Sequence, residues 1–277
     1  MNLLIQFLLR LCFGLAAGMA ITSSRQVTSG YFRNHMYVTL GLATLAAMVS
    51  YAAVPGVFWF CLAAAVLSYV GSVFWLYEMP LAGKVLLGTV LLASLAGALS
   101  QVTQIHQVKR QDISFRQNYS DLYHDSSHEI FPSPDFMFAT GAALVATSTS
   151  GLLLGMTMAA MLLGHWYLNT PTMELAPLRR LILAMGVAVA LQMIFSALSL
   201  WGELEYAQEI STQWWLFLLL RWSFGLVGVA VLAWMAWQTL KIPNTQSATG
   251  ILYVAVIGTF VGETMALLLS AQSLFPL

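Results

Sequence analysis

Two arginines and one glutamate lie inside long apolar runs of the sequence. Arg10 and Arg221 each fall about eight residues inside one end of a run, and Glu263 falls about seven residues short of such an end. At the rise of an α-helix, all three side chains would sit about 10 Å below the same membrane surface. A charge at that depth is costly unless it is paired or hydrated. We therefore expect the two guanidinium groups to grip the one carboxylate.

Such a charged cluster has two interpretations. In the first, it is a structural ion pair that fixes helix register, with one arginine reaching outward to the membrane surface. In the second, it belongs to a polar pocket for a quinol headgroup, in which Glu263 accepts a proton and Arg10 or Arg221 adjusts its acidity. The surplus positive charge leaves room for an anionic ligand or for another carboxylate, such as Glu203 or Glu205.

Small residues accompany these charges and would let the helices approach one another closely. Gly14 shares a helix stripe with Arg10, and Gly225 shares one with Arg221. Three glycine pairs also have the four-residue spacing of close helix packing: Gly14 and Gly18, Gly151 and Gly155, and Gly258 and Gly262. In a bundle of many helices this pattern indicates contacts within the chain.

The histidines are further candidates for binding. His106 follows the fourth apolar run and could line a pocket that opens at that end. His35 and His165 lie near the opposite membrane surface, where they could be axial haem ligands or, as we expect, ordinary interfacial residues. His124 and His128 could hold a metal if they were helical, but their acidic neighbours favour a hydrated loop.

The composition defines the class of protein that positions these residues. Of 277 residues, 59% are apolar and 8% are charged, whereas a soluble domain carries about a quarter charged residues. The net charge is zero and the mean hydropathy is +0.79, which excludes a soluble enzyme, a disordered chain and a nucleic-acid binder. Cys12 and Cys61 lie in apolar runs and predict neither disulfides nor a metal site. We expect an all-α, polytopic membrane bundle in which residues 1–277 form one domain.

Eight runs are long enough to cross the hydrocarbon layer, which needs about 20 apolar residues. They cover residues 3–21, 35–54, 57–77, 81–102, 136–168, 179–200, 214–240 and 248–270. The fifth run would reach about 50 Å as one helix, so we expect either an interfacial first part or a break at Thr147–Gly151, where hydroxyls can bond to backbone carbonyls. Because broken helices are typical of transport sites, a small-molecule transporter or channel is one alternative function.

Residues 103–135 form the one substantial polar segment, which predicts a long loop between the fourth and fifth helices. A loop of that length is more often functional or docked to a partner than idle. Basic residues concentrate in the short connections on the opposite side. The positive-inside rule therefore predicts that both termini and the long loop lie outside the cytoplasm, on the periplasmic side of a bacterial inner membrane.

Several local sequences resemble those of a known family of membrane subunits. These are Thr149–Gly155 with the apolar run that follows, Arg221 early in the seventh run, Lys241 in the next connection, and Gly262–Glu263 late in the last run. They are similar to membrane anchor subunits of the dimethyl sulfoxide reductase and polysulfide reductase (NrfD-like) type, as is the layout of eight spans with both ends outside. The chain departs from that family after its second run, where Tyr51 stands instead of an outer-side histidine.

The resemblance implies a non-catalytic integral membrane subunit of a respiratory or electron-transfer complex. Members of the family oxidise quinol near the outer face and pass electrons to an iron–sulfur protein, and a cytochrome is a second candidate partner. By resemblance, Glu263 and Arg221 take candidate roles at that site. The resemblance and the common depth of the intramembrane charges together give five candidate quinol contacts, which are Arg10, Arg221, Glu263, Glu203 and His106. Quinol is the expected ligand and the bilayer the expected surroundings, whereas haem b, other metals and nucleic acid are not expected. A purely structural or assembly subunit without a ligand is the remaining alternative.

Overall fold

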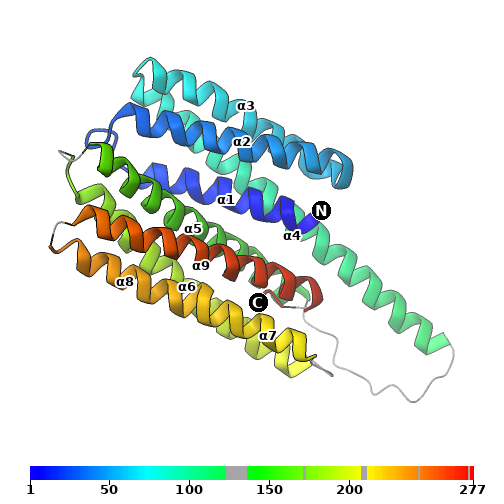
Figure 1. Cartoon of the computed structure of the whole chain (residues 1–277). Helices are drawn as coiled ribbons and strands as arrows, with labels where there is room; N and C mark the ends of the chain where they lie inside the picture. Colours follow the sequence, from blue (N-terminus) through cyan, green and yellow to red (C-terminus); the bar gives the residue numbers. More distant parts are fainter. Residues whose placement is uncertain (123–135, 171–172, 207–210, 243, 274) are drawn as a thin grey trace.

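The computed structural model describes residues 1–122, 136–170, 173–206, 211–242, 244–273 and 275–277, with side chains for all of these except 112–122, 136 and 206. Within that part of the chain, all regular structure is helical. Figure 1 shows the helices packed side by side along a common direction.

Eight helical segments among the described residues are long and apolar enough to cross a membrane. They are α1 (Asn2–Ile21), α2 (Ser29–Ala53), α3 (Pro55–Leu76), α4 (Pro80–Leu122), α5 (Phe136–Asn169), α6 (Ala176–Tyr206), the combined α7 (Thr212–Leu220), η1 (Arg221–Gly228) and α8 (Val229–Thr239), and α9 (Thr245–Gln272). The prediction of an all-α bundle of eight spans is confirmed. Helices of this length and hydropathy are those of an integral membrane protein.

The helices form two four-membered groups. In the first, α1 and α3 each pack against α2 and α4; in the second, α5 and α8 each pack against α6 and α9. Extensive contacts between α1 and α5 join the groups, and Figure 1 shows these two helices between α2 and α3 on one side and α6 to α8 on the other. Both ends of the chain lie at the same end of the bundle, where Asn2 and Pro276 line one cavity. We call this the terminal end.

Prolines and capping residues set several helix boundaries. Pro55 and Pro80 are the first residues of α3 and α4, where the absent N–H of proline leaves no helical hydrogen bond unmade. The Ser211 side chain accepts a hydrogen bond of 3.2 Å from a backbone N–H in the first turn of α7. Asn244 does the same at 3.0 Å for α9. Both caps satisfy donors that a helix start leaves unpaired.

The fifth span differs from its prediction. α5 is one unbroken helix of 34 residues, so the expected break at Thr147–Gly151 was wrong. The hydroxyls of Ser148 and Thr149 donate to backbone carbonyls four residues earlier in the same helix. They are therefore satisfied without interrupting the helical backbone.

The polar segment after the fourth span also differs. α4 continues to Leu122, so the prediction of a loop over residues 103–135 was wrong for its first twenty residues, and Figure 1 shows this part of α4 projecting beyond the bundle. Extending an existing helix requires no new nucleus, which is why polar residues without helical periodicity can continue it. Residues 123–135, including His124 and His128, lie outside the described residues.

The backbone irregularity lies instead in the seventh span. Residues Arg221–Gly228 form a π-helix, η1, between α7 and α8. π-Helical turns are rare and often accompany functional sites. Here the irregular segment begins at one of the buried arginines, so the change of pitch affects where that guanidinium points.

Two glycine contacts bring the charge-bearing helices together. A Cβ added to Gly14 would lie 1.7 Å from the carbonyl oxygen of Gly151, so α1 and α5 touch backbone to backbone. A Cβ added to Gly225 would lie 2.4 Å from the Cα of Gly262, so η1 and α9 also touch backbone to backbone. The expectation that small residues mediate close contacts within the chain is confirmed at both crossings.

Candidate functional site

The three intramembrane charges converge on one place in the bundle. Glu263 Oε1 lies 3.8 Å from Nη1 of Arg221, and Glu263 Oε2 lies 3.8 Å from Nη1 of Arg10. The Arg221 and Glu263 side chains are each 2% exposed, and that of Arg10 is 12% exposed. The predicted convergence of two guanidinium groups on one carboxylate is thus what the structure contains. We call these three residues the charged triad.

Ser150 of α5 links two members of the charged triad. Its hydroxyl donates a hydrogen bond to Glu263 Oε2, and its Oγ accepts one of 3.1 Å from Nη1 of Arg10. Arg10 belongs to the first helix group, whereas Ser150 and Glu263 belong to the second. The triad therefore lies where the two groups meet.

Two further hydrogen bonds of Arg10 go to neutral side chains. Its Nε donates to Gln6 Oε1 at 3.2 Å, and its Nη2 donates to Thr147 Oγ1 at 3.0 Å. Gln6 is itself anchored, because its amide donates to the Ala98 carbonyl of α4 at 3.1 Å. These contacts fix the plane of the guanidinium without adding negative charge.

Arg221 is held on the opposite side of the carboxylate. Its Nε donates to Ser196 Oγ of α6, and its Nη1 donates to the Gly262 carbonyl, each at 3.4 Å. Gly225 lies about one helical turn after Arg221 and contacts the backbone of Gly262. This close approach of η1 and α9 brings the Gly262 carbonyl within hydrogen-bonding distance of the Arg221 guanidinium.

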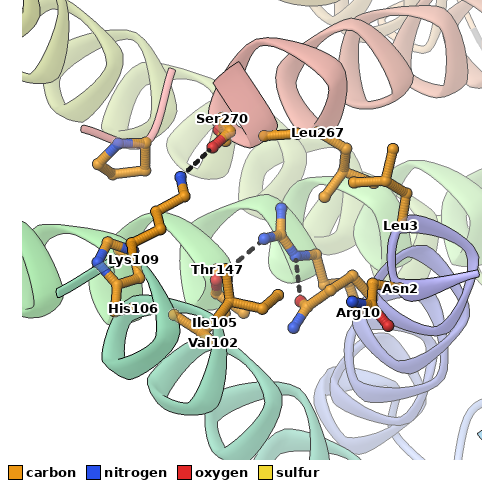
Figure 2. Close-up of a pocket in the computed structure, with 14 residues that line it drawn as sticks. Asn2, Leu3, Arg10, Val102, Ile105, His106, Lys109, Thr147, Leu267 and Ser270 are labelled. Atoms are coloured by element: carbon orange, nitrogen blue, oxygen red, sulfur yellow. Dashed lines mark hydrogen bonds between the residues drawn. The ribbon is translucent and has the colours of Figure 1, made fainter. Parts of the chain in front are cut away.

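A cavity of about 240 Å³ lies at the terminal end, between α1, α4, α5 and α9 (Figure 2). We call it the terminal cavity. Apolar side chains, among them Val102, Ile105 and Leu267, form much of its wall. Its polar lining includes Gln6, Arg10, Asn2, His106, Lys109, Thr147 and Ser270, and none of the described residues that line it is an aspartate or a glutamate.

His106 and Lys109 enter the terminal cavity from α4. His106 is 8% exposed, and its Nδ1 has no hydrogen-bond partner among the described residues. Lys109 Nζ donates to the backbone carbonyls of Ser270 and Ser273 at 2.8 Å each, which ties α4 to the end of α9. Figure 2 shows this lysine directed toward Ser270, on the other side of the cavity from Arg10.

The five candidate quinol contacts differ in where they lie relative to the terminal cavity. Arg10 and His106 line the terminal cavity, whereas Glu263 and Arg221 lie behind Arg10 and are absent from its lining. Glu203 is near the terminal end, where its Oε2 accepts a 2.9 Å hydrogen bond from the Phe275 N–H and its carboxylate interacts with Lys109. It does not join the charged triad.

The two candidate haem ligands have separate local partners. His35 is buried, with Nδ1 2.6 Å from the Tyr31 carbonyl and its ring in tilted contact with the ring of that tyrosine. His165 is exposed and lies 3.2 Å from the Tyr253 hydroxyl. No cluster of three or more potential metal-binding side chains occurs among the described residues.

Sequence reasoning did not identify Ser150, Thr147, Ser196 or Lys109 as parts of the site. The hydroxyl-rich stretch of α5 was interpreted as a weak point of the helix, yet two of its hydroxyls contact Arg10. The signal that could have predicted these contacts is that the hydroxyl-rich stretch and Arg10 lie at a similar depth in the membrane. Lys109 was assigned to a loop, and only the continuation of α4 gives it a fixed position.

Comparisons with protein-family models, curated proteins and solved structures found no match for this chain. The charged triad and the terminal cavity are therefore the features of the molecule that bear on its function.

Proposed function

We propose that the protein is a non-catalytic integral membrane subunit of an electron-transfer complex and binds a quinol headgroup in the terminal cavity. The observation that carries this proposal is a cavity in which apolar walls meet Arg10 and His106, whose Nδ1 has no partner among the described residues. A quinol headgroup likewise combines an apolar surface with a few polar groups, because its apolar ring carries two polar oxygens. Ligand sites combine apolar walls with a few polar groups in this way.

Quinol oxidation releases two protons and two electrons. Different residues around the terminal cavity would assist different steps of this reaction. His106 Nδ1 is available to take the first proton as a quinol O–H bond breaks. The second proton leaves to water through the open side of the cavity, and both electrons pass to an iron–sulfur or haem centre of a partner subunit. Arg10 orients the ring oxygen, and Glu263 holds Arg10 in place. We therefore assign proton uptake to His106 rather than to Glu263, which does not line the cavity.

The projecting end of α4 supports a partner on the same side. His106 and Lys109 lie on α4 shortly before the part that extends beyond the bundle in Figure 1. A redox subunit docked on that extension would lie near the terminal cavity. We assign this end to the extracytoplasmic side of a bacterial inner membrane, because basic residues concentrate in connections at the other end.

A structural or assembly subunit is the second candidate. The burial of Glu263 and Arg221 favours it, since a paired triad in a dry core can fix helix packing without any ligand. The transporter alternative rested on a broken fifth span, and α5 is unbroken.

Binding of a short-chain quinol analogue to the purified protein in nanodiscs tests the proposal. We expect His106→Ala to raise the dissociation constant about tenfold, which corresponds to one lost hydrogen bond of about 1.4 kcal/mol. His165→Ala is the matched control, because His165 is exposed and far along α5 from the cavity residues. Absence of binding to the unmodified protein, or equal effects of the two variants, would reject the quinol site and favour the structural candidate.

A further inference from the structure

Among the described side chains, the charges around the terminal cavity do not balance. Three cationic side chains, Arg10, Arg221 and Lys109, face two carboxylates, Glu263 and Glu203. The surplus lies in the charged triad, where two guanidinium groups share the single carboxylate of Glu263 in a largely buried region. A buried charge without a counter-charge is costly, so the surplus favours an additional negative group.

Arg10 is the cation through which this surplus reaches the terminal cavity. Arg221 is almost fully buried against Glu263 Oε1, and Lys109 is held by two carbonyls and by Glu203. Arg10 lines the cavity, shares Glu263 with Arg221, and donates hydrogen bonds to the neutral side chains of three described residues. Its field is therefore the least compensated of the three.

No acidic side chain among the described residues lines the terminal cavity to oppose a negative ligand. The apolar side chains around Arg10 lower the local polarity, which strengthens electrostatic attraction. Arginine is also well suited to an oxyanion, because it is permanently charged and presents several N–H donors.

We propose that the terminal cavity binds its headgroup as an anion, with an ionised ring oxygen toward Arg10. This inference rests on the proposed quinol-binding function and specifies the form of ligand that the cavity selects. The site would prefer acidic hydroxyquinones, and the deprotonated form of a quinol, over neutral rings of the same size.

Two ring-matched ligands test this preference. A 2-hydroxy-1,4-naphthoquinone is ionised at neutral pH, and its methyl ether is neutral. Dissociation constants are measured by quenching of tryptophan fluorescence, using the full chain in phosphatidylcholine nanodiscs and empty nanodiscs as the partition control. We expect the anion to bind at least about tenfold more tightly than the ether.

Variants locate the preference. Arg10→Gln should make the two affinities equal, and Arg10→Lys should retain part of the difference. Arg25→Gln is the control, because Arg25 is exposed in the connection after α1, at the other end of the bundle. Retention of the full preference in Arg10→Gln would overturn the assignment to Arg10.

The remaining outcomes separate the two proposals. Equal binding of anion and ether to the unmodified protein would overturn anion selection and leave the quinol site standing. Binding of neither ligand would overturn both. Weaker binding of the anion in phosphatidylglycerol nanodiscs, abolished by Arg10→Gln, would support an oxyanion site at Arg10 for which lipid headgroups compete.

Discussion

Glu263 presents one carboxylate oxygen to each of two guanidinium groups, at 3.8 Å in both cases. The Ser150 hydroxyl fixes the orientation of that carboxylate. Without the negative charge, Arg10 and Arg221 would remain buried near one another with nothing between them to offset their repulsion. The charged triad is thus one electrostatic unit whose stability depends on its single acid.

Glu263→Gln tests this dependence, because it keeps the side-chain size and an acceptor for Ser150 while removing the charge. We expect the free energy of unfolding to fall by about 3–5 kcal/mol, as for a broken buried ion pair. Denaturant titration of the purified protein in mild detergent measures the change. Glu205→Gln, at an exposed position of α6, should change the free energy of unfolding by less than about 0.5 kcal/mol. Equal stability of the two variants would show that the triad contributes no net stability.

For single residues, the sequence could predict the depth of a side chain along the membrane normal. The constant rise of a helix places Arg10, Arg221 and Glu263 at one level, and they do meet. Depth does not fix direction around the helix axis. Glu203, a candidate on the same side, therefore turned out to contact Phe275 near the chain end rather than the triad.

Among the helical elements, α1 and α5 have the tightest constraint. Gly14 lies one turn from Arg10 and faces the backbone of Gly151, which follows Ser150 directly. A side chain at this crossing would push the helices apart and separate Arg10 from its partners on α5.

We therefore expect Gly14→Ala to destabilise the protein by about 1–3 kcal/mol through overpacking. Gly41→Ala in α2 is the control, since a Cβ at Gly41 would meet nothing within 4 Å, and alanine favours helix by up to about 1 kcal/mol relative to glycine. Thermal unfolding in detergent would compare the two variants. A Gly14→Ala protein as stable as Gly41→Ala would mean that the α1–α5 contact relaxes at no cost.

Element boundaries were the least predictable feature. The hydropathy pattern predicted all eight spans. It did not predict that polar residues after residue 102 continue α4, nor that the hydroxyl-rich part of α5 stays helical. The π-helix η1 had no recognisable signal in the sequence either. Each depends on which neighbours satisfy the backbone and side-chain polar groups once the helices have packed.

At the scale of the whole molecule, two four-helix groups meet along α1 and α5, and neither holds a complete site. The first group supplies Arg10, His106 and Lys109, and the second supplies Ser150 and Glu263. Joining them buries the charged triad and forms the terminal cavity. Ligand binding and assembly of the groups are therefore expected to be linked.

The orientation of the bundle is testable with single cysteines. Native Cys12 and Cys61 are 0% exposed, so a thiol reagent should report only introduced sites. We expect a membrane-impermeant maleimide to label Glu205→Cys on intact cells and to label Arg25→Cys only after the membrane is opened, because basic connections stay in the cytoplasm. The reverse pattern would invert the topology and move the terminal cavity to the cytoplasmic side.

The membrane class, the number of spans and the common depth of three charges follow from the amino-acid sequence alone, because hydrophobicity and helical rise act along each segment independently of the others. The packed bundle was needed to show which helix faces meet, that Ser150 lies between Arg10 and Glu263, and that His106 lines a cavity while Glu263 does not. Those outcomes depend on the rotation and mutual contact of helices. Close approach at Gly14 and Gly225 sets them, and no single segment contains that information.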